Sequence, residues 1–277
     1  MSDPVTSTTR LAAVIGDPVR HSMSPTIHNA GFAACGIDAV YVALPVSEGH
    51  AAEAIHAMRT FGLMGYSVTM PHKAAVLASC DELTDTAKML GSVNCVFWRD
   101  DKIVGDSTDG DGFVRGLQAD LGVSVSGLRC VLYGAGGAAG AVAYALAQAG
   151  ATEVVVVNRT ASKATTVANL AGEVGRVGTP ADLATADLVI NATPLGMGST
   201  DHVDAVPFDV AVLHGDAVVS DLIYHPAETV LVAQARARGL AAQNGLAMLV
   251  HQAVVAFEHW TGVDAPVDAM TAAVADR

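Results

Sequence analysis

The most constraining feature of the sequence is a glycine-rich turn between two apolar runs. Residues 131–140 are Val-Leu-Tyr-Gly-Ala-Gly-Gly-Ala-Ala-Gly, and residues 154–160 are Val-Val-Val-Val-Asn-Arg-Thr. The first run predicts a buried strand, a tight turn and a helix of small residues, and the second predicts another buried strand. The spacing Gly134-x-Gly136-x-x-Ala139 is a weak signal alone. Between two apolar strands at βαβ distance, it is typical of a dinucleotide-binding unit.

The small residues of this turn have separate predicted roles. Gly134 allows the tight turn, and Gly136 lets the backbone approach a pyrophosphate. Ala139 and Gly140 keep the helix close to the sheet, so that its positive N-terminal end faces the phosphate charge. We therefore expect the phosphates to lie against Gly134, Ala135, Gly136, Gly137 and Ala138.

The end of the second strand predicts which dinucleotide binds. An NAD site usually carries Asp or Glu there, to accept a hydrogen bond from the ribose 2′-hydroxyl. This chain has Asn158-Arg159-Thr160 followed by Lys163, and these side chains would attract a 2′-phosphate. We therefore predict NADP rather than NAD. The alternative, that Arg159 is only a solvated residue at a helix start, is less favoured behind this glycine loop.

Length, composition and charge narrow the class of protein. A chain of 277 residues can form one large domain or two medium ones. Apolar residues make up 51% of it and aromatic residues only 5%, which suits α/β packing with helices close to a sheet. The formal net charge of −13 argues against nucleic acid or an anionic membrane surface as a partner. An anionic ligand must therefore be collected by local basic residues.

Cysteine and histidine spacing indicates neither a metal site nor a redox motif. None of the ten histidines belongs to an HExxH or paired-ligand motif, so we expect no metal. Residues 130–152 carry no charge, but their glycines favour strand–turn–helix over a membrane span. Residues 1–10 lack the apolar core of a signal peptide, so we expect a cytoplasmic protein. The four cysteines are expected to be buried thiols in a reducing compartment: Cys35, Cys80, Cys95 and Cys130.

The N-terminal half alternates predicted strands and helices. Strands at 11–16, 40–44 and 65–70 imply a largely parallel sheet, with ligands at the carboxyl ends of its strands. Ser24-Pro25 predicts a helix start, with the serine as N-cap and the proline at the first helical position. Ser22 has no such structural explanation. The polar side chains at these strand ends are Ser22, Ser24, Ser67, Thr69 and Lys73.

Lys73 is the residue of this group that most needs an explanation. Pro71-His72-Lys73 is predicted to open a helix, where a lysine faces the positive end of the macrodipole at a cost of up to ~1 kcal/mol. A lysine that simply reaches solvent is the usual alternative. The hydroxyl side chains nearby favour a proton donor or acceptor.

Asp109 follows a cluster of turn residues that predicts a domain boundary, and on its own it could be only a helix N-cap.

A strongly apolar helix is predicted at 246–260. Because it is apolar on nearly all sides, it must be buried, and we expect it to pack on the N-terminal domain. Gln252 within it needs polar partners, either core backbone or a hydroxylated ligand. The predicted domains are therefore residues 1–109 with 246–277, and residues 110–245.

Taken together, these motifs make the chain resemble shikimate dehydrogenase, of the shikimate/quinate dehydrogenase family, along nearly its whole length. The matching residues are Gly16-Asp17-Pro18, Ser22-x-Ser24-Pro25, Val68-Thr69-x-Pro71-x-Lys73, Gly91-x-Val93-Asn94, Gly105-Asp106-x-Thr108-Asp109-Gly110, Gly134-Ala135-Gly136-Gly137-Ala138, Asn158-Arg159-Thr160, Asn191-Ala192-Thr193-Pro194-x-Gly196-Met197, Asp221-x-x-Tyr224-x-Pro226, and Gly245 with Met248-Leu249-Val250-x-Gln252-Ala253.

The resemblance implies an α/β protein with two domains around a cleft, an N-terminal substrate domain with a mainly parallel sheet and a Rossmann-type NADP domain. It implies reversible NADP-linked reduction of 3-dehydroshikimate to shikimate, in the chorismate pathway to aromatic amino acids, by a monomer or homodimer. Lys73 and Asp109 would be the acid–base pair. The substrate would be held by Ser22, Ser24, Ser67, Thr69, Asn94, Tyr224 and Gln252. Leu222 and Gly245 would line the nicotinamide end of the cofactor site, and the glycine loop with Asn158, Arg159, Thr160 and Lys163 would hold the rest of NADP.

Three residues depart from the family pattern, since Ser67, Ser107 and His225 stand where asparagine is usual. Ser67 offers one hydroxyl in place of an amide, which leaves room for an NAD(P)-dependent quinate/shikimate or aminoshikimate-type dehydrogenase. A non-catalytic NADP-binding sensor would have disabled chemistry, whereas Lys73 and Asp109 are both present. Methylenetetrahydrofolate dehydrogenase shares the two-domain layout and a lysine, but not these substrate-loop motifs.

Overall fold

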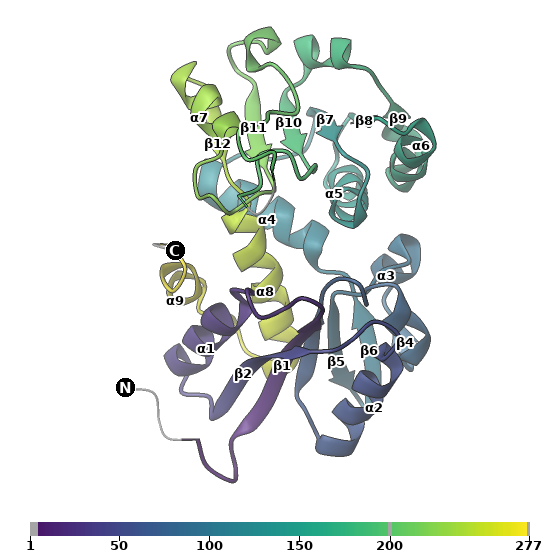
Figure 1. The fold of residues 1–277 in the computed structure, drawn as a ribbon, viewed down its shortest axis with the longest axis vertical. Coiled ribbons are helices and arrows are strands. Elements are labelled where there is room, and N and C mark those ends of the chain that lie inside the picture. Colours follow the sequence, from purple (N-terminus) through teal and green to yellow (C-terminus); the bar gives the residue numbers. More distant parts are fainter. Residues whose placement is uncertain (1–4, 199–200, 276–277) are drawn as a thin grey trace. The chain divides into compact units, whose positions relative to one another are not determined.

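The computed structural model describes residues 5–198 and 201–275 and divides into two α/β units (Figure 1). Unit 1 comprises the described residues up to Thr108 together with those from Gln252 onward, and unit 2 runs from Asp109 to His251. The division therefore falls inside α8 (Leu246–Thr261). The predicted fold class, α/β with two α/β domains, is confirmed.

Unit 1 is built on a six-stranded mixed sheet in the order β2-β1-β3-β5-β6-β4. Its elements are β1 (Arg10–Gly16), α1 (Ser24–Ala34), β2 (Ala39–Pro45), α2 (Ala51–Phe61), β3 (Gly65–Val68), the 3₁₀ helix η1 (Ala75–Ser79), β4 (Glu82–Leu83), α3 (Asp85–Leu90), β5 (Cys95–Arg99), β6 (Lys102–Asp106), the second part of α8, and α9 (Val267–Ala272). β1 pairs in parallel with β2 and β3, and β4 with β6, whereas β5 is antiparallel to both β3 and β6. A two-residue turn at Asp100 and Asp101, both with positive φ, joins β5 to β6 and imposes that direction.

Each face of the unit 1 sheet is covered by its own helices, because successive strand residues point to opposite sides. Ala13 and Ile15 of β1 belong to a buried cluster with α2, η1 and α3. On the other face, Tyr41 of β2 lies 5.6 Å from the ring of Trp260 in α8. α8 thus completes the core of the unit 1 sheet, as its apolar sequence predicts.

Two local predictions in unit 1 are wrong. α1 begins at Ser24 with Met23 as the N-cap, and no side chain caps it, so Ser24 is not the predicted cap. Ser22 instead has a structural role, since its Oγ accepts a hydrogen bond from Ser24 N at 3.2 Å. Residues 71–74 form turns that lead into the five-residue η1, so Lys73 does not open an α-helix and the macrodipole argument does not apply to it.

Unit 2 is a doubly wound sheet in the order β12-β11-β10-β7-β8-β9, in which neighbouring strands of the described residues pair in parallel. Its elements are α4 (Asp109–Leu121), β7 (Arg129–Tyr133), α5 (Gly137–Gln148), β8 (Glu153–Val157), α6 (Ala161–Leu170), η2 (Gly172–Val174), β9 (Gly175–Val177), η3 (Pro180–Thr185), β10 (Leu188–Asn191), η4 (Val210–Val212), β11 (Val218–Asp221), α7 (Val230–Ala237), β12 (Ala241–Gln243) and the first part of α8. The chain leaves β7 toward β8 on one side and returns to β10 on the other. This reversal is the topological switch point at which α/β sheets bind ligands.

The strand residues of unit 2 alternate between two buried clusters. Leu132 of β7 faces α4, α5 and α6, whereas Val131 faces η3, η4 and α7. Both faces of the sheet are therefore covered, which explains why its strands are almost continuously apolar.

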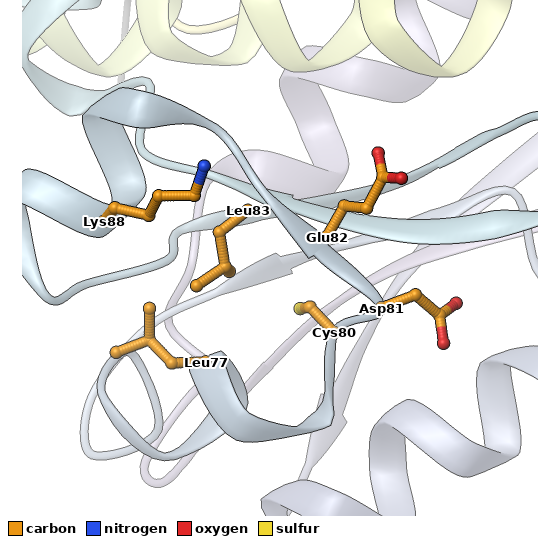
Figure 2. Close-up of a pocket in the computed structure, with 6 residues that line it drawn as sticks. All are labelled: Leu77, Cys80, Asp81, Glu82, Leu83 and Lys88. Atoms are coloured by element: carbon orange, nitrogen blue, oxygen red, sulfur yellow. The ribbon is translucent and has the colours of Figure 1, made fainter.

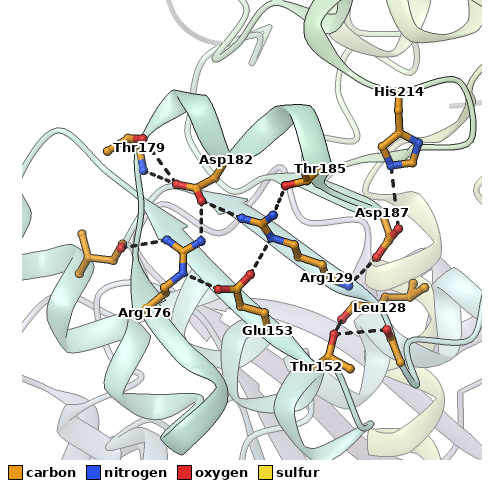
Figure 3. A network of polar contacts seen from close by, with 12 residues as sticks. Leu128, Arg129, Thr152, Glu153, Arg176, Thr179, Asp182, Thr185, Asp187 and His214 are labelled. Atoms are coloured by element: carbon orange, nitrogen blue, oxygen red, sulfur yellow. Dashed lines mark hydrogen bonds and ion pairs between the residues drawn. The ribbon is translucent and has the colours of Figure 1, made fainter.

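At the amino ends of β7 and β8, two arginines and two carboxylates alternate in an ion-pair network (Figure 3). Asp182 Oδ1 lies 2.8 Å from Arg129 Nη2 and 2.5 Å from Arg176 Nη2. Glu153 pairs with the same two arginines, 2.6 Å from Arg129 Nε. The network ties three neighbouring strands to η3 at the edge opposite the glycine turn.

The cysteines differ from the expected pattern. Cys95 and Cys130 are buried, but Cys80 is only half-buried and Cys35 is exposed; all four are free thiols. Cys35 directly follows α1, at a helix end that the core does not cover.

Candidate functional site

The turn after β7 has the shape that its glycine predicts. Gly134 adopts φ +113°, a conformation that side chains rarely allow. A Cβ at this position would lie 2.6 Å from the carbonyl oxygen of Ala192, the residue after β10. Glycine is therefore required both for the backbone conformation and for the contact between the two strand ends.

The N-terminus of α5 is open to a ligand. Gly136 is its N-cap, and within the described residues no side chain caps this end of the helix. Gly136, Gly137 and Ala138 are exposed, and a Cβ built at either glycine would meet nothing within 4 Å. Backbone N–H groups at an uncapped helix start bind phosphate well, so these residues fit the pyrophosphate of a dinucleotide.

The end of β8 has the positive charge that its sequence predicts. Arg159, Thr160 and Lys163 are exposed, and among the described residues neither cation forms an ion pair. Asn158 has a local role, since its Nδ2 donates to Thr160 O at 3.0 Å and shapes the turn into α6. Two exposed cations without a carboxylate at this strand end fit a ribose 2′-phosphate better than a 2′-hydroxyl.

On the other side of the switch point, the structure brings Leu222 and Gly245 together. Gly245 N donates to Ile223 O at 2.9 Å, and a Cβ at Gly245 would lie 2.1 Å from the carbonyl oxygen of Leu222. Tyr224 follows in the same loop and is half-buried, and burial raises the pKa of its phenol.

In unit 1, the predicted polar residues gather at one edge of the sheet. β1, β3 and β6 end at this edge, and β5 begins there because it is antiparallel to β3 and β6. Thr69 therefore lies beside Asn94, and Val68 N donates to Asn94 O at 2.7 Å. Asn94 N in turn donates to Asp106 O at 2.9 Å. The remaining predicted residues of this group are Ser22, which is half-buried, and Ser24 and Ser67, which are buried.

Thr108, which is not one of the predicted substrate residues, is 1% exposed at this edge. Its backbone N donates to Asn94 Oδ1 at 2.7 Å, and its Oγ1 donates to the carbonyl oxygen of Gln252 at 3.2 Å. Thr108 thus fixes the Asn94 amide and ties it to α8. The only signal for this role was its place beside Asp109 in the Gly-Asp-x-Thr-Asp motif.

Asp106 is a second residue whose role was missed. Its carboxylate accepts hydrogen bonds from Thr84 Oγ1, Ser107 N and His259 Nε2, at 2.8 Å for Ser107 and 3.2 Å for His259. Burial opposes ionisation of this group, but the three hydrogen bonds outweigh it and lower the pKa of Asp106. The ring of His259 also stacks on Phe97 at 4.1 Å. Asp106 therefore anchors the end of β6 to α8.

Lys73 and Asp109 come from different units. Lys73 lies in the turn before η1, and its carbonyl oxygen accepts a hydrogen bond from Val93 N at 2.8 Å. The backbone of Lys73 is therefore bonded to the residue that precedes Asn94, just before β5 begins. Asp109 is the first residue of α4 and begins unit 2.

A separate pocket of about 440 Å³ opens between η1, β4 and α3 (Figure 2). It is lined by Leu77, Cys80, Asp81, Glu82, Leu83 and Lys88. Its charged side chains are already paired, Asp81 with Arg59, Glu82 with Lys102 and Lys88 with Asp85. None of the predicted site residues lines this pocket, and we assign it no role in the chemistry.

Across residues 5–198 and 201–275, no group of three or more His, Cys, Asp or Glu side chains is placed to hold a metal ion. In the same residues, no helix is both long and apolar enough to cross a membrane.

Three family models match parts of this chain. Residues 14–96 match the model of the shikimate dehydrogenase substrate binding domain, residues 117–196 that of shikimate / quinate 5-dehydrogenase, and residues 245–275 that of the shikimate 5′-dehydrogenase C-terminal domain. The shikimate dehydrogenase (NADP(+)) of Symbiobacterium thermophilum is 43% identical over 96% of this chain and 94% of its own length.

Solved structures of the same kind cover both units. A shikimate dehydrogenase in complex with NADP⁺ has a TM-score of 0.91 and 37% identity over 99% of this chain and 97% of its own. The Thermus thermophilus shikimate 5-dehydrogenase in complex with NADP(H) and shikimate has a TM-score of 0.88 and 33% identity, over 96% and 98% of the two chains. This chain therefore belongs to the shikimate dehydrogenase family.

Proposed function

We propose that this protein catalyses the reversible NADP-linked reduction of 3-dehydroshikimate to shikimate, in the chorismate pathway to aromatic amino acids. The observation that carries the proposal is the open, uncapped N-terminus of α5 together with the two exposed cations after β8. The chain that carries these features is 43% identical to a shikimate dehydrogenase (NADP(+)). The relatives favour this activity over a quinate- or aminoshikimate-type dehydrogenase and over a non-catalytic sensor.

The chemistry requires a proton donor as well as a cofactor. NADPH, when bound, supplies the hydride that reduces the ketone. The ketone oxygen then becomes an alkoxide, so a proton must be delivered to it from within hydrogen-bond reach. We assign this proton to Lys73 Nζ. The Asp109 carboxylate would orient the ammonium and the substrate hydroxyl, which stabilises the charge that develops during the reaction.

The remaining predicted residues suit a small polyhydroxy acid. A site built from hydroxyl and amide groups discriminates strongly, because a substrate lacking one hydroxyl leaves a buried polar group unpaired. We assign substrate recognition to Ser22, Ser24, Ser67, Thr69, Asn94, Tyr224 and Gln252, and NADP binding to unit 2. On this proposal, residues 1–109 with 246–277 form the substrate domain and residues 110–245 the NADP domain of a cytoplasmic monomer or homodimer.

The test is the appearance of NADPH absorbance from shikimate and NADP⁺, with quinate and NAD⁺ measured alongside. We expect turnover with shikimate and NADP⁺ to exceed the other combinations. Lys73→Ala should lose about 100- to 10,000-fold in kcat with a smaller change in KM, the usual contribution of a general acid. Lys88→Ala, at an exposed lysine that pairs with Asp85, is the matched control and should retain normal turnover. Faster oxidation of quinate, or near-normal turnover of Lys73→Ala, would overturn the assignment.

A further inference from the structure

Asp221, the last residue of β11, is a fully buried carboxylate. Its side chain is 0% exposed, and within the described residues no lysine, arginine or histidine pairs with it. Oδ1 accepts hydrogen bonds from Asn191 Nδ2 at 2.9 Å and Ile223 N at 3.1 Å, and Oδ2 accepts one from Thr229 Oγ1 at 2.8 Å. A buried charge is costly unless its hydrogen-bonding capacity is used, and here both oxygens are occupied.

The first of these bonds shapes the loop after β10. Asn191 Nδ2 also donates to Leu195 O at 3.1 Å, and Asn191 Oδ1 accepts from Thr193 N at 2.9 Å and from Thr193 Oγ1 at 2.7 Å. The Asn191 amide is fully used, so its orientation is set by the Asp221 carboxylate on one side and by residues 193–195 on the other. This loop also contains Ala192, whose carbonyl lies against Gly134.

The other two bonds shape the loop after β11. Ile223 N, held by Asp221 Oδ1, precedes the Ile223 carbonyl that accepts from Gly245 N at 2.9 Å. Thr229 uses its hydroxyl twice, donating to Asp221 Oδ2 and accepting from Val232 N at 3.2 Å as the N-cap of α7. One carboxylate therefore fixes both ends of the segment that contains Tyr224 and His225.

Both loops lie on one side of the switch point. β10 and β11 neighbour each other on the side of β7 away from β8. A dinucleotide that crosses a switch point places one mononucleotide half on each side. The glycine turn and Arg159 belong to the β7–β8 side, so the loops held by Asp221 belong to the other, nicotinamide half.

We propose that Asp221 is a positioning residue that shapes the nicotinamide half of the cofactor site through Asn191 and Thr229, without touching the cofactor. The proposal rests on the proposed function, because it assumes that NADP binds across this switch point. It assigns to Asp221 an effect on one half of the cofactor only, which a general role in folding would not produce.

The test compares two probes of different length. 2′,5′-ADP carries the adenosine and its 2′-phosphate but no nicotinamide, whereas NADPH spans both halves. In Asp221→Ala, the affinity for 2′,5′-ADP should stay within about twofold of wild type. The affinity for NADPH or the kcat for shikimate should fall about 10- to 100-fold, the scale of a misplaced reacting group. Both dissociation constants can be measured by calorimetry on the full-length protein.

Two further variants keep the result interpretable if Asp221→Ala folds poorly. Asp221→Asn retains one acceptor oxygen, and Thr229→Val preserves volume but removes the donor to Asp221 Oδ2 together with the N-cap of α7. Each variant should show the same NADPH-specific loss to a smaller degree. The matched control is Asp209→Ala, at an exposed aspartate of unit 2 that accepts a hydrogen bond from Ala211 N at 2.8 Å. This substitution should leave the affinities for 2′,5′-ADP and NADPH unchanged.

Failure of the positioning role and failure of the proposed function would give different results. If all three variants lost affinity for 2′,5′-ADP and for NADPH equally, Asp221 would not have a positioning role. Wild-type affinity for both probes together with wild-type kcat would also overturn that role. Failure of the wild-type protein to bind 2′,5′-ADP, or to oxidise shikimate, would instead count against the proposed function.

Discussion

Asn94 and Thr108 bind each other through reciprocal hydrogen bonds. Thr108 N donates to Asn94 Oδ1 at 2.7 Å, and Asn94 Nδ2 donates to Thr108 Oγ1 at 3.1 Å. The two residues are 14 positions apart and lie where β5 begins and β6 ends. The amide of Asn94 is therefore held by a residue that we do not expect to contact the substrate.

We expect Thr108→Val to impair substrate binding although the shape of the side chain is preserved. Loss of the hydroxyl removes a partner of Asn94 Nδ2 and the bond to Gln252 O, whereas the bond from Thr108 N to Asn94 Oδ1 remains, so both predicted substrate residues lose part of their support. Loss of one such buried hydrogen bond costs about 1–3 kcal/mol, which corresponds to a roughly 5- to 100-fold higher KM for shikimate. Steady-state kinetics would measure this change.

Thr165→Val is the control for this substitution. Thr165 lies on the exposed side of α6, where its hydroxyl donates to Ala161 O at 3.1 Å. The KM for NADP should be unchanged in both variants. An unaltered KM for shikimate in Thr108→Val would remove the supporting role of Thr108.

Substitutions at two glycines of the same turn should have different effects. Gly134→Ala combines φ +113° with a Cβ 2.6 Å from Ala192 O, so we expect loss of both stability and NADP binding. At Gly136, φ is −92° and a Cβ meets nothing within 4 Å, so Gly136→Ala should fold normally yet crowd the phosphate. Thermal unfolding with and without NADP separates the two effects. Gly215→Ala, another open position, should change neither measurement.

The choice of cofactor should depend on Arg159. Its guanidinium is exposed after β8, where it would pair with a 2′-phosphate but has nothing to recognise in NAD. A charge-assisted bond of this kind is worth about 1.5–3 kcal/mol, so Arg159→Ala should lose about 10- to 100-fold in kcat/KM with NADP. The kcat/KM with NAD should change little. Equal losses with both cofactors would show that Arg159 does not read the 2′-phosphate.

The ion-pair network at the amino ends of β7 and β8 should make stability depend on acid pH. The hydrogen bond from Arg176, helped by the charge of Arg129, lowers the pKa of Asp182 to about 2. Because the folded pKa lies below the ordinary value of about 3.9, the stabilisation is present above about pH 5 and is lost as pH falls toward 2. At neutral pH this difference corresponds to ~2 kcal/mol.

Denaturant titrations of Asp182→Asn would test this dependence. The variant should be less stable than wild type at pH 7, and the difference should shrink as the pH is lowered toward 2. Asp264→Asn, at an exposed position, should match wild type throughout. A stability difference that is constant with pH would mean that the carboxylate charge does not contribute.

Much of unit 2 could be predicted because its signals are local. The run Val131 to Gly140 carries its own turn glycine and small helix residues, and β7, the turn and α5 follow that order. The short strands β9 and β12 and the short helix α9 were not predicted, because segments of three to six residues have too little periodicity to be distinguished from loops. The helix expected to open at Pro71 was also wrong, since residues 71–74 form turns and the buried His72 has its Nε2 2.7 Å from Val46 O, a partner 26 residues away.

The sequence by itself determined the α/β class, the glycine turn that opens α5 and the cations after β8, because each of these depends on residues within a few positions of one another. Only the tertiary structure decided which side chains hold the site together. Thr108 finds its partner in Gln252, 144 residues away, and Asp221 finds its partner in Asn191, 30 residues away. The physical reason is that burial makes an unpaired polar group costly, and its partner is whichever residue the packed sheets bring within 3 Å, which spacing along the chain does not reveal.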